Sequence, residues 1–543
     1  AYSGGGTFAM GSSNVTLYAQ WAPVDYTVTY NGNGNTGGAV PTDGNTYNIT
    51  DTVTVLGNTG SLVRTGYTFD GWDTAADGSG TAYSGGGTFA MGSSNVTLYA
   101  QWRRQSSGSG GTSQNEEKPV IVIVNGNEQN AGTETRTVRS GVATVVVTVD
   151  NKAIDSKIDE AIRNNPGGTG NGVEIPVADT DSAAASVALT GDIVKKLEQN
   201  AFDVSVRRDN VAYVIPAQEF NISNTAQRLG VPETELQDIK VEVNIRNLDE
   251  AVVEKYREVA DANGAELIFP PVAFEVVAET VNADGTTSRL PVDRFTNYVQ
   301  RVMEIPAGVD PSKVTTGIVF NADGTYSHVP TEVYQENGKW YARLNSLTNS
   351  EYSVVWNPVT VASVENHWSK DAVNDMASRL VIVDAENFVP NKAITRAGFA
   401  EYIVRALGLY REGGVPEVSF TDVNDTEVSA LAIKIASANG IVTGYPDGTF
   451  KPERNITREE AMVMYGRAMG ITKLLGSDAL RYQQYADYQS VGAWAQASVK
   501  EVLAAHVFNG ISATRLSPKS NLTCAEAAQA IRNLLVESGL INR

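Results

Sequence analysis

Hydrophobic and polar residues alternate along the first part of the chain. The alternation is clear in residues 26–30 and 96–102, and Gly, Asn and Asp punctuate the sequence around both segments. A two-residue period predicts half-buried β-strands separated by turns. We therefore expect a small β-module at this end of the chain.

The same alternation continues through residues 118–360, where we expect a β-rich region with two lobes. Turns at Asn282-Ala-Asp-Gly285 and Asn321-Ala-Asp-Gly324 suit β-hairpins. Helical periods interrupt the strands near residues 154–163 and 248–263. The expected strands are residues 120–124, 143–149, 212–215, 240–245, 274–277, 317–320 and 352–356.

Beyond residue 360 the pattern changes to short amphipathic helices in three repeated units. The repeats are marked by Ile394-Thr-Arg-Ala-Gly-Phe399, Ile456-Thr-Arg-Glu-Glu-Ala461 and Leu522-Thr-Cys-Ala-Glu-Ala527. Such self-similarity predicts a triplet of modules, which we place at residues 361–415, 416–480 and 481–543.

A second, exact repeat lies at the other end. Residues 1–21 recur unchanged as residues 82–102. We expect 1–21 to be the tail of a truncated unit, 22–102 a complete unit and 103–117 a Gly/Ser-rich linker. On this interpretation the chain begins inside a repeat and is the C-terminal portion of a longer protein.

Composition narrows the functional classes. The 543 residues include one Cys and three His, which argues against a disulfide framework or a Cys- or His-rich metal centre. The net charge of −20 disfavours nucleic acid and anionic membranes, and there is no apolar run of membrane-spanning length. The charge divides into −5 for residues 1–102, −13 for 103–364 and −2 for 365–543, so an anionic ligand fits the C-terminal triplet best.

The sequence lacks the common catalytic motifs. It contains no P-loop, no G-x-S-x-G, no H-E-x-x-H and no EF-hand loop. Glu266, Glu275 and Glu279 could pair as in glycosidases, but a solvated strand face explains them better. We therefore expect no catalytic residue, no metal and no cofactor.

The triplet carries one unusual feature. Thr457 with Glu460, and Thr523 with Glu526, have the T-x-x-E form of a helix capping box. Arg396 and Arg458 follow the capping Thr, where a cation opposes the helix dipole. A guanidinium beside exposed helix-terminal N–H groups would suit a carboxylate or phosphate; packing or a salt bridge between repeats is the alternative.

The order Phe420-Thr-Asp-Val423, a helix, Gly440-Ile-Val-Thr-Gly-Tyr-Pro-Asp-Gly-Thr-Phe450 and then Ile456-Thr-Arg-Glu-Glu-Ala461 resembles an S-layer homology (SLH) module. The resemblance implies an all-α triplet arranged as a pseudo-threefold helical bundle. It also implies grooves between modules that bind a secondary cell-wall polymer, a pyruvylated glycan, in Gram-positive envelopes.

Carried over residue by residue, the resemblance implies a ligand-binding set. The motif Arg is matched by Arg396 and Arg458, the leading acidic residue by Asp422 and Asp487, and the helix-start Trp by Trp368 and Trp494. Core packing is an equal alternative for the two Trp residues.

Four positions depart from the pattern. Cys524 replaces the third Arg, Ser363 the first Asp, Val428 the second Trp and Gly398 the first motif Glu. We therefore expect at most two competent grooves, with the one that would use Cys524 degenerate.

The unit at 22–102, with Gly66-Tyr-Thr-Phe-Asp-Gly-Trp72, resembles the Listeria-Bacteroides (internalin-type B) repeat. The resemblance implies a β-grasp-like spacer or adhesive stalk whose partners are host or neighbouring surface proteins. We expect Tyr67, Phe69, Trp72 and Trp102 to form its core.

Together these features predict a multidomain extracellular protein of the cell wall or S-layer, anchored noncovalently and not an enzyme. The alternatives are the wall-tethering part of a polysaccharide hydrolase whose catalytic domain lies upstream, and a protein that assembles into a surface lattice.

Overall fold

A computed structural model describes residues 24–543 with gaps at 66, 77–79, 105–117, 140, 167–169, 322–323, 412–416 and 426–428, together with residues 7 and 9. The chain divides into two compact units, Ala1–Gln114 and Asn115–Arg543. Almost all of the expected repeat tail at 1–21, most of the expected linker at 103–117, and Gly66 and Val428 lie outside the described residues.

The first unit is built from two small sheets. One has the order β1-β6-β3-β4, with β1 parallel to β6, and the other pairs β2 with β5. The strands are β1 (Val28–Asn31), β2 (Thr52–Thr54), β3 (Tyr67–Asp73), β4 (Ala82–Tyr83), β5 (Thr88–Ala90) and β6 (Val96–Arg104).

Aromatic side chains form the core of this unit. Trp72 is fully buried, meets Tyr30 and Phe69 edge to face, and donates its indole N–H to the Leu56 carbonyl (2.9 Å). Phe69, Trp102 and Tyr83 pack against it partly buried. The prediction that the aromatics serve the core is thus confirmed for Trp72, Phe69 and Trp102.

The β-grasp expectation is not met in the described residues of this unit, which contain strands and turns but no helix. The segment between β1 and β3 is rich in Gly, Asn and Thr, which favour turns and extended chain over helix.

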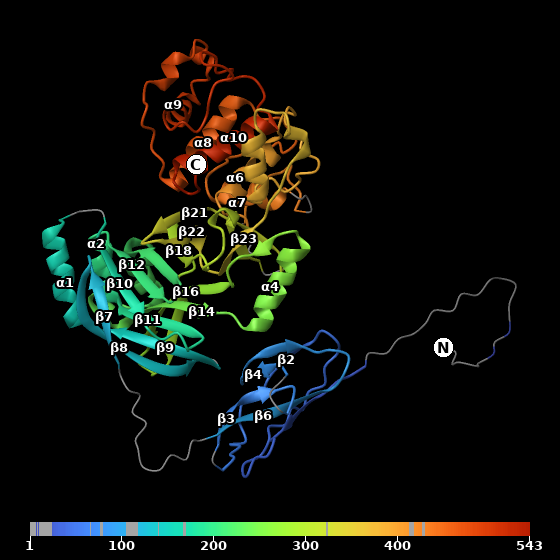
Figure 1. Ribbon diagram of the computed structural model, residues 1–543. Coiled ribbons are helices and arrows are strands. Elements are labelled where there is room, and N and C mark those ends of the chain that lie inside the picture. The colour runs from blue at the N-terminus through green and yellow to red at the C-terminus, as the bar shows by residue number, and fades with distance from the viewer. Residues whose placement is uncertain are drawn as a thin grey trace. The chain divides into compact units, whose positions relative to one another are not determined.

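In the second unit, strands β7 to β23 join in one network of seventeen strands (Figure 1). The largest buried cluster of this region runs from Val120 to Val354, and a smaller one contains Ala260, Ala265, Ile318, Phe320 and Val355. The division into two lobes stays a prediction. The strands are β7 (Lys118–Val124), β8 (Asn127–Arg139), β9 (Val142–Val149), β10 (Gly172–Val177), β11 (Ala184–Thr190), β12 (Asp203–Arg208), β13 (Val211–Pro216), β14 (Ile239–Asn247), β15 (Glu266–Leu267), β16 (Val272–Val281), β17 (Thr287–Pro291), β18 (Arg294–Glu304), β19 (Thr316–Phe320), β20 (Tyr326–Val329), β21 (Thr331–Glu336), β22 (Lys339–Thr348) and β23 (Glu351–Trp356).

All seven strands expected between residues 118 and 360 are present, and both expected helices are confirmed. The turn at Asn282–Gly285 closes a hairpin between β16 and β17: Asn282 N–H donates to the Thr286 carbonyl (2.7 Å), and Gly285 adopts the left-handed conformation (φ 83°). The helices of this region are α1 (Asn151–Asn164), α2 (Gly191–Gln199), α3 (Ile222–Leu229) and α4 (Glu250–Ala262).

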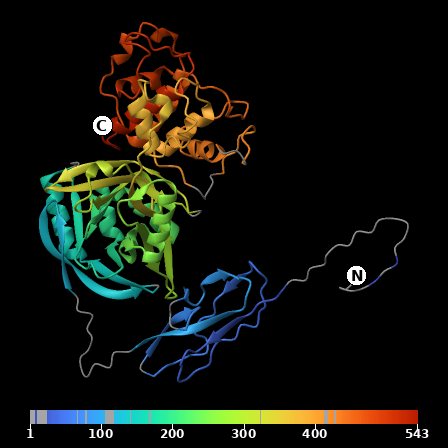
Figure 2. The same ribbon diagram turned by 45° about the vertical axis from the view of Figure 1, so that its right-hand side comes forward.

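The described residues of the C-terminal triplet contain six α-helices of nine to fifteen residues, two from each module. Figure 2 shows these helices, coloured orange to red, with stretches of coil between them. The second helix of each module packs against the first helix of another: α6 against α7, α8 against α9, and α10 against α5. The helices are α5 (Lys370–Ser378), α6 (Arg396–Ala406), α7 (Ala430–Ala438), α8 (Arg458–Thr472), α9 (Gln496–Ala504) and α10 (Cys524–Glu537).

The expectation of an all-α triplet in a pseudo-threefold helical bundle is wrong. Long loops, turns and 3-10 segments separate the helices, the helical content of the triplet is modest, and the chain as a whole is mostly β-sheet. The reason lies in the sequence: turn-forming residues such as Pro446, Gly448 and Pro452 interrupt the apolar pattern between the helices.

Backbone hydrogen bonds tie the three modules together in a closed ring. Ile394 N–H donates to the Leu522 carbonyl (2.9 Å), Ile456 N–H to the Ile394 carbonyl (3.1 Å), and Leu522 N–H to the Ile456 carbonyl (2.9 Å). Each of these residues directly precedes the N-cap Thr of α6, α8 or α10. The ring therefore sets the places at which these helices begin.

Candidate functional site

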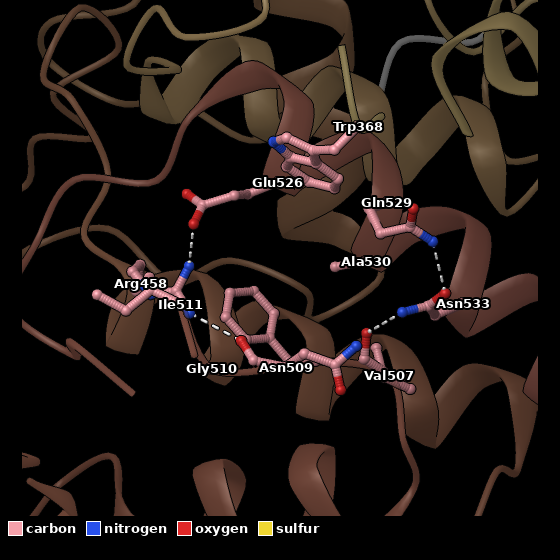
Figure 3. Close-up of a pocket in the computed structure, with 11 residues that line it drawn as sticks. Trp368, Arg458, Val507, Asn509, Gly510, Ile511, Glu526, Gln529, Ala530 and Asn533 are labelled. Atoms are coloured by element: carbon pink, nitrogen blue, oxygen red, sulfur yellow. Dashed lines mark hydrogen bonds and ion pairs between the residues drawn. The ribbon is translucent and has the colours of Figure 1, made fainter. Parts of the chain in front are cut away.

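Two grooves lie where stretches from all three modules meet. The first, the Arg458 groove, has a volume of about 380 Å³ (Figure 3). It is lined by Trp368, Arg458, Val507, Phe508, Asn509, Gly510, Ile511, Glu526, Gln529, Ala530 and Asn533.

Arg458 is 2% exposed, and all three of its guanidinium nitrogens have partners. Nε donates to the Leu516 carbonyl (2.9 Å), Nη2 to the Asn509 carbonyl (2.8 Å), and Nη1 pairs with Glu526 Oε1 (2.5 Å). Figure 3 shows the Glu526 carboxylate pointing toward the guanidinium. Burial lowers the pKa of Arg458, while Glu526 acts in the opposite direction. The inter-repeat salt bridge considered from the sequence is thus present here.

The second groove, the Arg396 groove, has a volume of about 410 Å³. It is lined by Arg396, Val442, Thr443, Gly444, Tyr445, Glu460, Val463, Met464, Arg467 and Trp494.

Arg396 differs from Arg458 in its partners. Its Nε donates to the Phe450 carbonyl (3.0 Å), and its guanidinium lies over the rings of Tyr445 (4.8 Å) and Phe450 (4.9 Å). Among the residues that the structure describes, no carboxylate oxygen lies within 4.0 Å of its nitrogens. Burial lowers the pKa of Arg396 as well. The two arginines therefore share a backbone acceptor at Nε but not a counter-ion.

The predicted acidic residues hold the loops on which the arginines rest. Asp422 accepts hydrogen bonds from Phe450 N–H (2.7 Å) and Lys451 N–H (2.8 Å). Asp487 does the same for Leu516 N–H and Ser517 N–H (both 2.8 Å). Burial opposes ionisation of Asp487, but these two N–H groups, the Asp487 backbone N–H and the charge of Arg515 together lower its pKa. Neither Asp lines a groove, so each acts on its arginine through the loop carbonyl.

The two predicted tryptophans lie in the grooves with most of their surface exposed. Trp368 is 63% exposed in the Arg458 groove, and Trp494 is 61% exposed in the Arg396 groove. Core packing, the alternative considered from the sequence, is therefore excluded for both. A flat aromatic face beside polar groups is suited to stacking against a sugar ring.

The third module has no arginine at the position equivalent to Arg396 and Arg458. Cys524 stands there, partly buried against the core, and burial raises the pKa of its thiol. The Ser363 hydroxyl donates to the Phe388 carbonyl (2.6 Å), the counterpart of the carbonyls that receive Arg396 and Arg458. The loss of the Asp and the loss of the Arg thus fall on the same loop.

One part of the sequence argument is wrong. The helix-terminal N–H groups beside the arginines are not exposed: Arg396 N–H donates to the Arg454 carbonyl (2.9 Å) and Ala397 N–H to the Pro452 carbonyl (3.1 Å), and α8 repeats this with Ser520 and Pro518. Loops of another module occupy these donors. These helix-terminal donors are therefore not available to an anion in the grooves.

Several lining residues were missed from the sequence. In α8 these are Val463, Met464 and Arg467, which follow Glu460 at helical spacings of three, four and seven; in α10 the corresponding residues are Gln529, Ala530 and Asn533, which follow Glu526. These spacings place residues on one helix face, so the signal was available once the motif Glu was assigned.

The described part of the chain holds no group of three His, Cys, Asp or Glu arranged as metal ligands. None of the helices in that part is long and apolar enough to cross a bilayer.

Comparison with known families identifies two kinds of domain in this chain. Residues 363–400, 419–462 and 484–528 match the S-layer homology domain, and residues 26–101 match the Listeria-Bacteroides repeat domain. The chain therefore carries three SLH domains and one such repeat, as the sequence predicted.

Several known proteins are similar in sequence to parts of this chain. An amylopullulanase of Thermoanaerobacterium thermosulfurigenes is 29% identical over 45% of this chain and 13% of its own length. Exoglucanase XynX of Acetivibrio thermocellus is 30% identical over 35% of this chain and 18% of its own. The surface layer protein of Brevibacillus choshinensis is 42% identical over 16% of this chain and 8% of its own. The chain thus spans less than a fifth of each.

SLH domains are anchoring modules that bind cell-wall polymers. The three SLH domains, together with the surface-layer and cell-wall proteins among the relatives, indicate a cell-wall or surface location.

Proposed function

We propose that this chain anchors an extracellular protein noncovalently to the cell wall by binding a pyruvylated secondary cell-wall polymer in the Arg396 and Arg458 grooves. The observation that carries the proposal is the Arg396 guanidinium, which reaches a groove of about 410 Å³ with no carboxylate of its own chain within 4.0 Å among the described residues.

The charge of the Arg396 groove supports an anionic ligand. Arg396 and Arg467 both line it, while its one lining carboxylate, Glu460, is held by Arg454. A planar guanidinium can receive a carboxylate through two parallel hydrogen bonds, which is the geometry that a pyruvyl group offers.

Each groove also contains an exposed tryptophan on which a sugar ring can stack. Trp494 presents an exposed face at this groove, and Trp368 presents one at the other. An aromatic face can cover the apolar face of a sugar, while the carboxylate fixes its orientation. Asp422 and Asp487 act in this scheme by holding the loops that receive the Arg Nε groups.

The test is calorimetric titration of the full chain with purified, pyruvylated wall polymer. Arg396→Ala is expected to weaken binding by about two orders of magnitude, because a charge-assisted bidentate pair is lost. Arg396→Lys keeps the charge without the fork and should recover only part of the affinity.

Arg257→Ala is the matched control, since Arg257 is a partly exposed Arg on helix α4 that pairs with Glu254 and does not line either groove. Unchanged affinity in a double Arg396→Ala, Arg458→Ala variant that remains folded would refute the proposal.

A second candidate comes from the names of the relatives, which include an amylopullulanase and an exoglucanase. We propose, as the alternative, that the same anchor tethers a polysaccharide hydrolase. The full reading frame tests this idea: a glycosidase domain joined to the chain would support it, and its absence would leave the surface-protein function. Hydrolysis of wall or plant glycans by this chain alone would overturn the view that it is not itself an enzyme.

We further propose that the Listeria-Bacteroides repeat serves as a spacer or adhesive stalk. Phe69, Trp72 and Trp102 belong to the core or pack against it, which favours a structural role over sugar binding for these three aromatic residues. Surface-display assays with and without residues 22–102 test this role: a stalk role predicts lower accessibility of an N-terminal tag to antibody when the repeat is removed.

A further inference from the structure

We infer that Arg454, together with its counterpart Ser520, decides whether the motif glutamate competes with a ligand for the arginine of each groove. Both residues lie three positions before the N-cap Thr, in the second and third modules respectively. The inference rests on the proposed function and goes further, because it assigns a different ligand class to each groove.

Glu460 and Glu526 make the same hydrogen bonds through one of their two carboxylate oxygens. Glu460 Oε2 accepts from Thr457 N–H (2.9 Å) and Thr457 Oγ1 (3.0 Å). Glu526 Oε2 accepts from Thr523 N–H (3.0 Å) and Thr523 Oγ1 (3.2 Å). Both capping boxes are complete, so one oxygen of each carboxylate is committed and the other is available.

The second oxygen has a different partner in each case. Glu460 Oε1 pairs with Arg454 and also accepts from Tyr445 Oη (3.4 Å), and Arg454 Nη1 in turn donates to Tyr445 Oη (2.8 Å). Glu526 Oε1 pairs with Arg458 Nη1 (2.5 Å). Arg454 and Tyr445 therefore draw Glu460 away from Arg396.

The third module lacks both of these partners. Ser520 is too short to reach the carboxylate and contacts the Ser517 hydroxyl instead (3.4 Å). Ile511 occupies the place of Tyr445, five residues after a left-handed residue that follows the first helix (His506, like Gly440). With no competing donor, Glu526 neutralises Arg458.

The grooves therefore differ in the ligand that they favour. In the Arg396 groove two arginines face a carboxylate that is already paired, so a sugar bearing a carboxylate is favoured. In the Arg458 groove the charge is balanced, and the other polar side chains of the lining are the amides of Asn509, Gln529 and Asn533. Such a surface favours an uncharged sugar bearing hydroxyl or acetamido groups.

The probes are a methyl hexopyranoside carrying a 4,6-linked pyruvate ketal and the methyl ester of the same compound, titrated into the full chain. The parent is expected to bind the acid about tenfold or more tightly than the ester, because a charge-assisted pair is lost in the ester. Arg454→Ser should reduce this preference to about twofold, because Glu460 then turns to Arg396.

Two further variants separate competition from a structural effect. Arg454→Lys keeps a cation for Glu460 and should retain the preference. Arg454→Ser with Glu460→Gln should recover it, since Gln can still close the capping box but no longer neutralises Arg396. Arg543→Ser, which removes a largely exposed arginine of the third module that pairs with Glu537, is the control and should leave the preference unchanged.

The reverse substitution, Ser520→Arg, is the strongest single test of the inference. Ser520→Arg should draw Glu526 from Arg458 and add a second acid-binding site, raising the measured stoichiometry from one to two. A crystal structure of Arg454→Ser should show Glu460 Oε1 within ion-pair distance of Arg396.

An Arg454→Ser variant that keeps the preference, or whose Glu460 stays away from Arg396, would overturn the inference. If the parent binds neither probe nor wall polymer, the proposed function fails, and the position of Glu460 in that crystal structure then decides the inference by itself.

Discussion

The Arg396 and Arg458 grooves have the same frame but use their arginines differently. In both, an Asp holds a loop through two backbone N–H groups, and a carbonyl of that loop accepts from the arginine Nε. Both guanidinium groups lie over aromatic rings, but only Arg458 closes an ion pair, with Glu526. A repeated module can thus keep its architecture while the partners of its arginine change.

The largest expected difference is in stability. Arg458→Ala leaves the part-buried Glu526 without its cation and should lower the free energy of unfolding of the modules by about 3–5 kcal/mol. Arg396→Ala removes one hydrogen bond and two ring contacts and should cost only about 1–2 kcal/mol. Urea denaturation of both variants measures the gap.

Equal losses in the two variants would contradict the assignment of separate roles. Arg458→Ala with Glu526→Gln provides the control: Gln keeps the capping box without an unpaired charge, and this double variant should recover part of the loss.

The loop-holding aspartates come next. Asp422→Ala and Asp487→Ala each remove two charge-assisted hydrogen bonds to backbone N–H groups and should each cost about 1–3 kcal/mol. Asp422→Ala should in addition weaken binding of the carboxylate probe, because the Phe450 carbonyl that receives Arg396 loses its support. Ser363→Ala, at the third loop, should leave probe binding unchanged.

If Asp487→Ala weakened binding of the carboxylate probe as much as Asp422→Ala does, the difference proposed between the two grooves would be contradicted. It would indicate that both grooves, and not mainly the Arg396 groove, bind the acid.

The sequence was sufficient for the local features of these grooves. Alternation predicted the strands of the β region, and T-x-x-E predicted both capping boxes. These features depend on neighbours within a few residues, where pattern is informative. Arg396, Arg458, Trp368 and Trp494 were instead singled out by the resemblance to the SLH module, and the structure places all four in groove walls.

The features that no local pattern could reveal depend on contacts between modules. The helix-terminal N–H groups of α6 are filled by carbonyls about 55 residues away, which no local pattern reveals. The partner chosen by Glu526 is likewise set by Arg458 of another module. The expected helical bundle failed for a different reason: turn-forming residues such as Pro446 and Gly448 separate the helices, so loops and a backbone ring, and not helix faces alone, join the modules.

A smaller effect is expected from the tryptophans. Trp494→Ala should weaken binding of the acid probe about three- to tenfold, because stacking against an aromatic face is worth about 0.5–1.5 kcal/mol. Trp368→Ala should affect the acid probe little, since it lines the charge-balanced groove, and should instead weaken binding of an uncharged sugar. Both side chains are mostly exposed, so thermal stability should hardly change and serves as the internal control.

The finest test of the comparison is its pH dependence. Burial opposes ionisation of both Asp487 and Glu460, yet the pKa of each is lowered in the folded protein. For Asp487 the cause is the Leu516 and Ser517 N–H groups with smaller contributions from its own backbone N–H and Arg515, and for Glu460 it is Thr457 and Arg454. A carboxylate with a depressed folded pKa stabilises the protein above its unfolded pKa, near 4, and this stabilisation is lost as the pH falls through the folded value. Asp487→Asn should therefore lose less melting temperature than the parent between pH 6 and pH 3, by about 2 °C for a region of this size. Ser363→Ala changes a loop held by a hydroxyl and should follow the parent. An Asp487→Asn variant as acid-sensitive as the parent would mean that the charge of Asp487 does not hold the loop beneath Arg458.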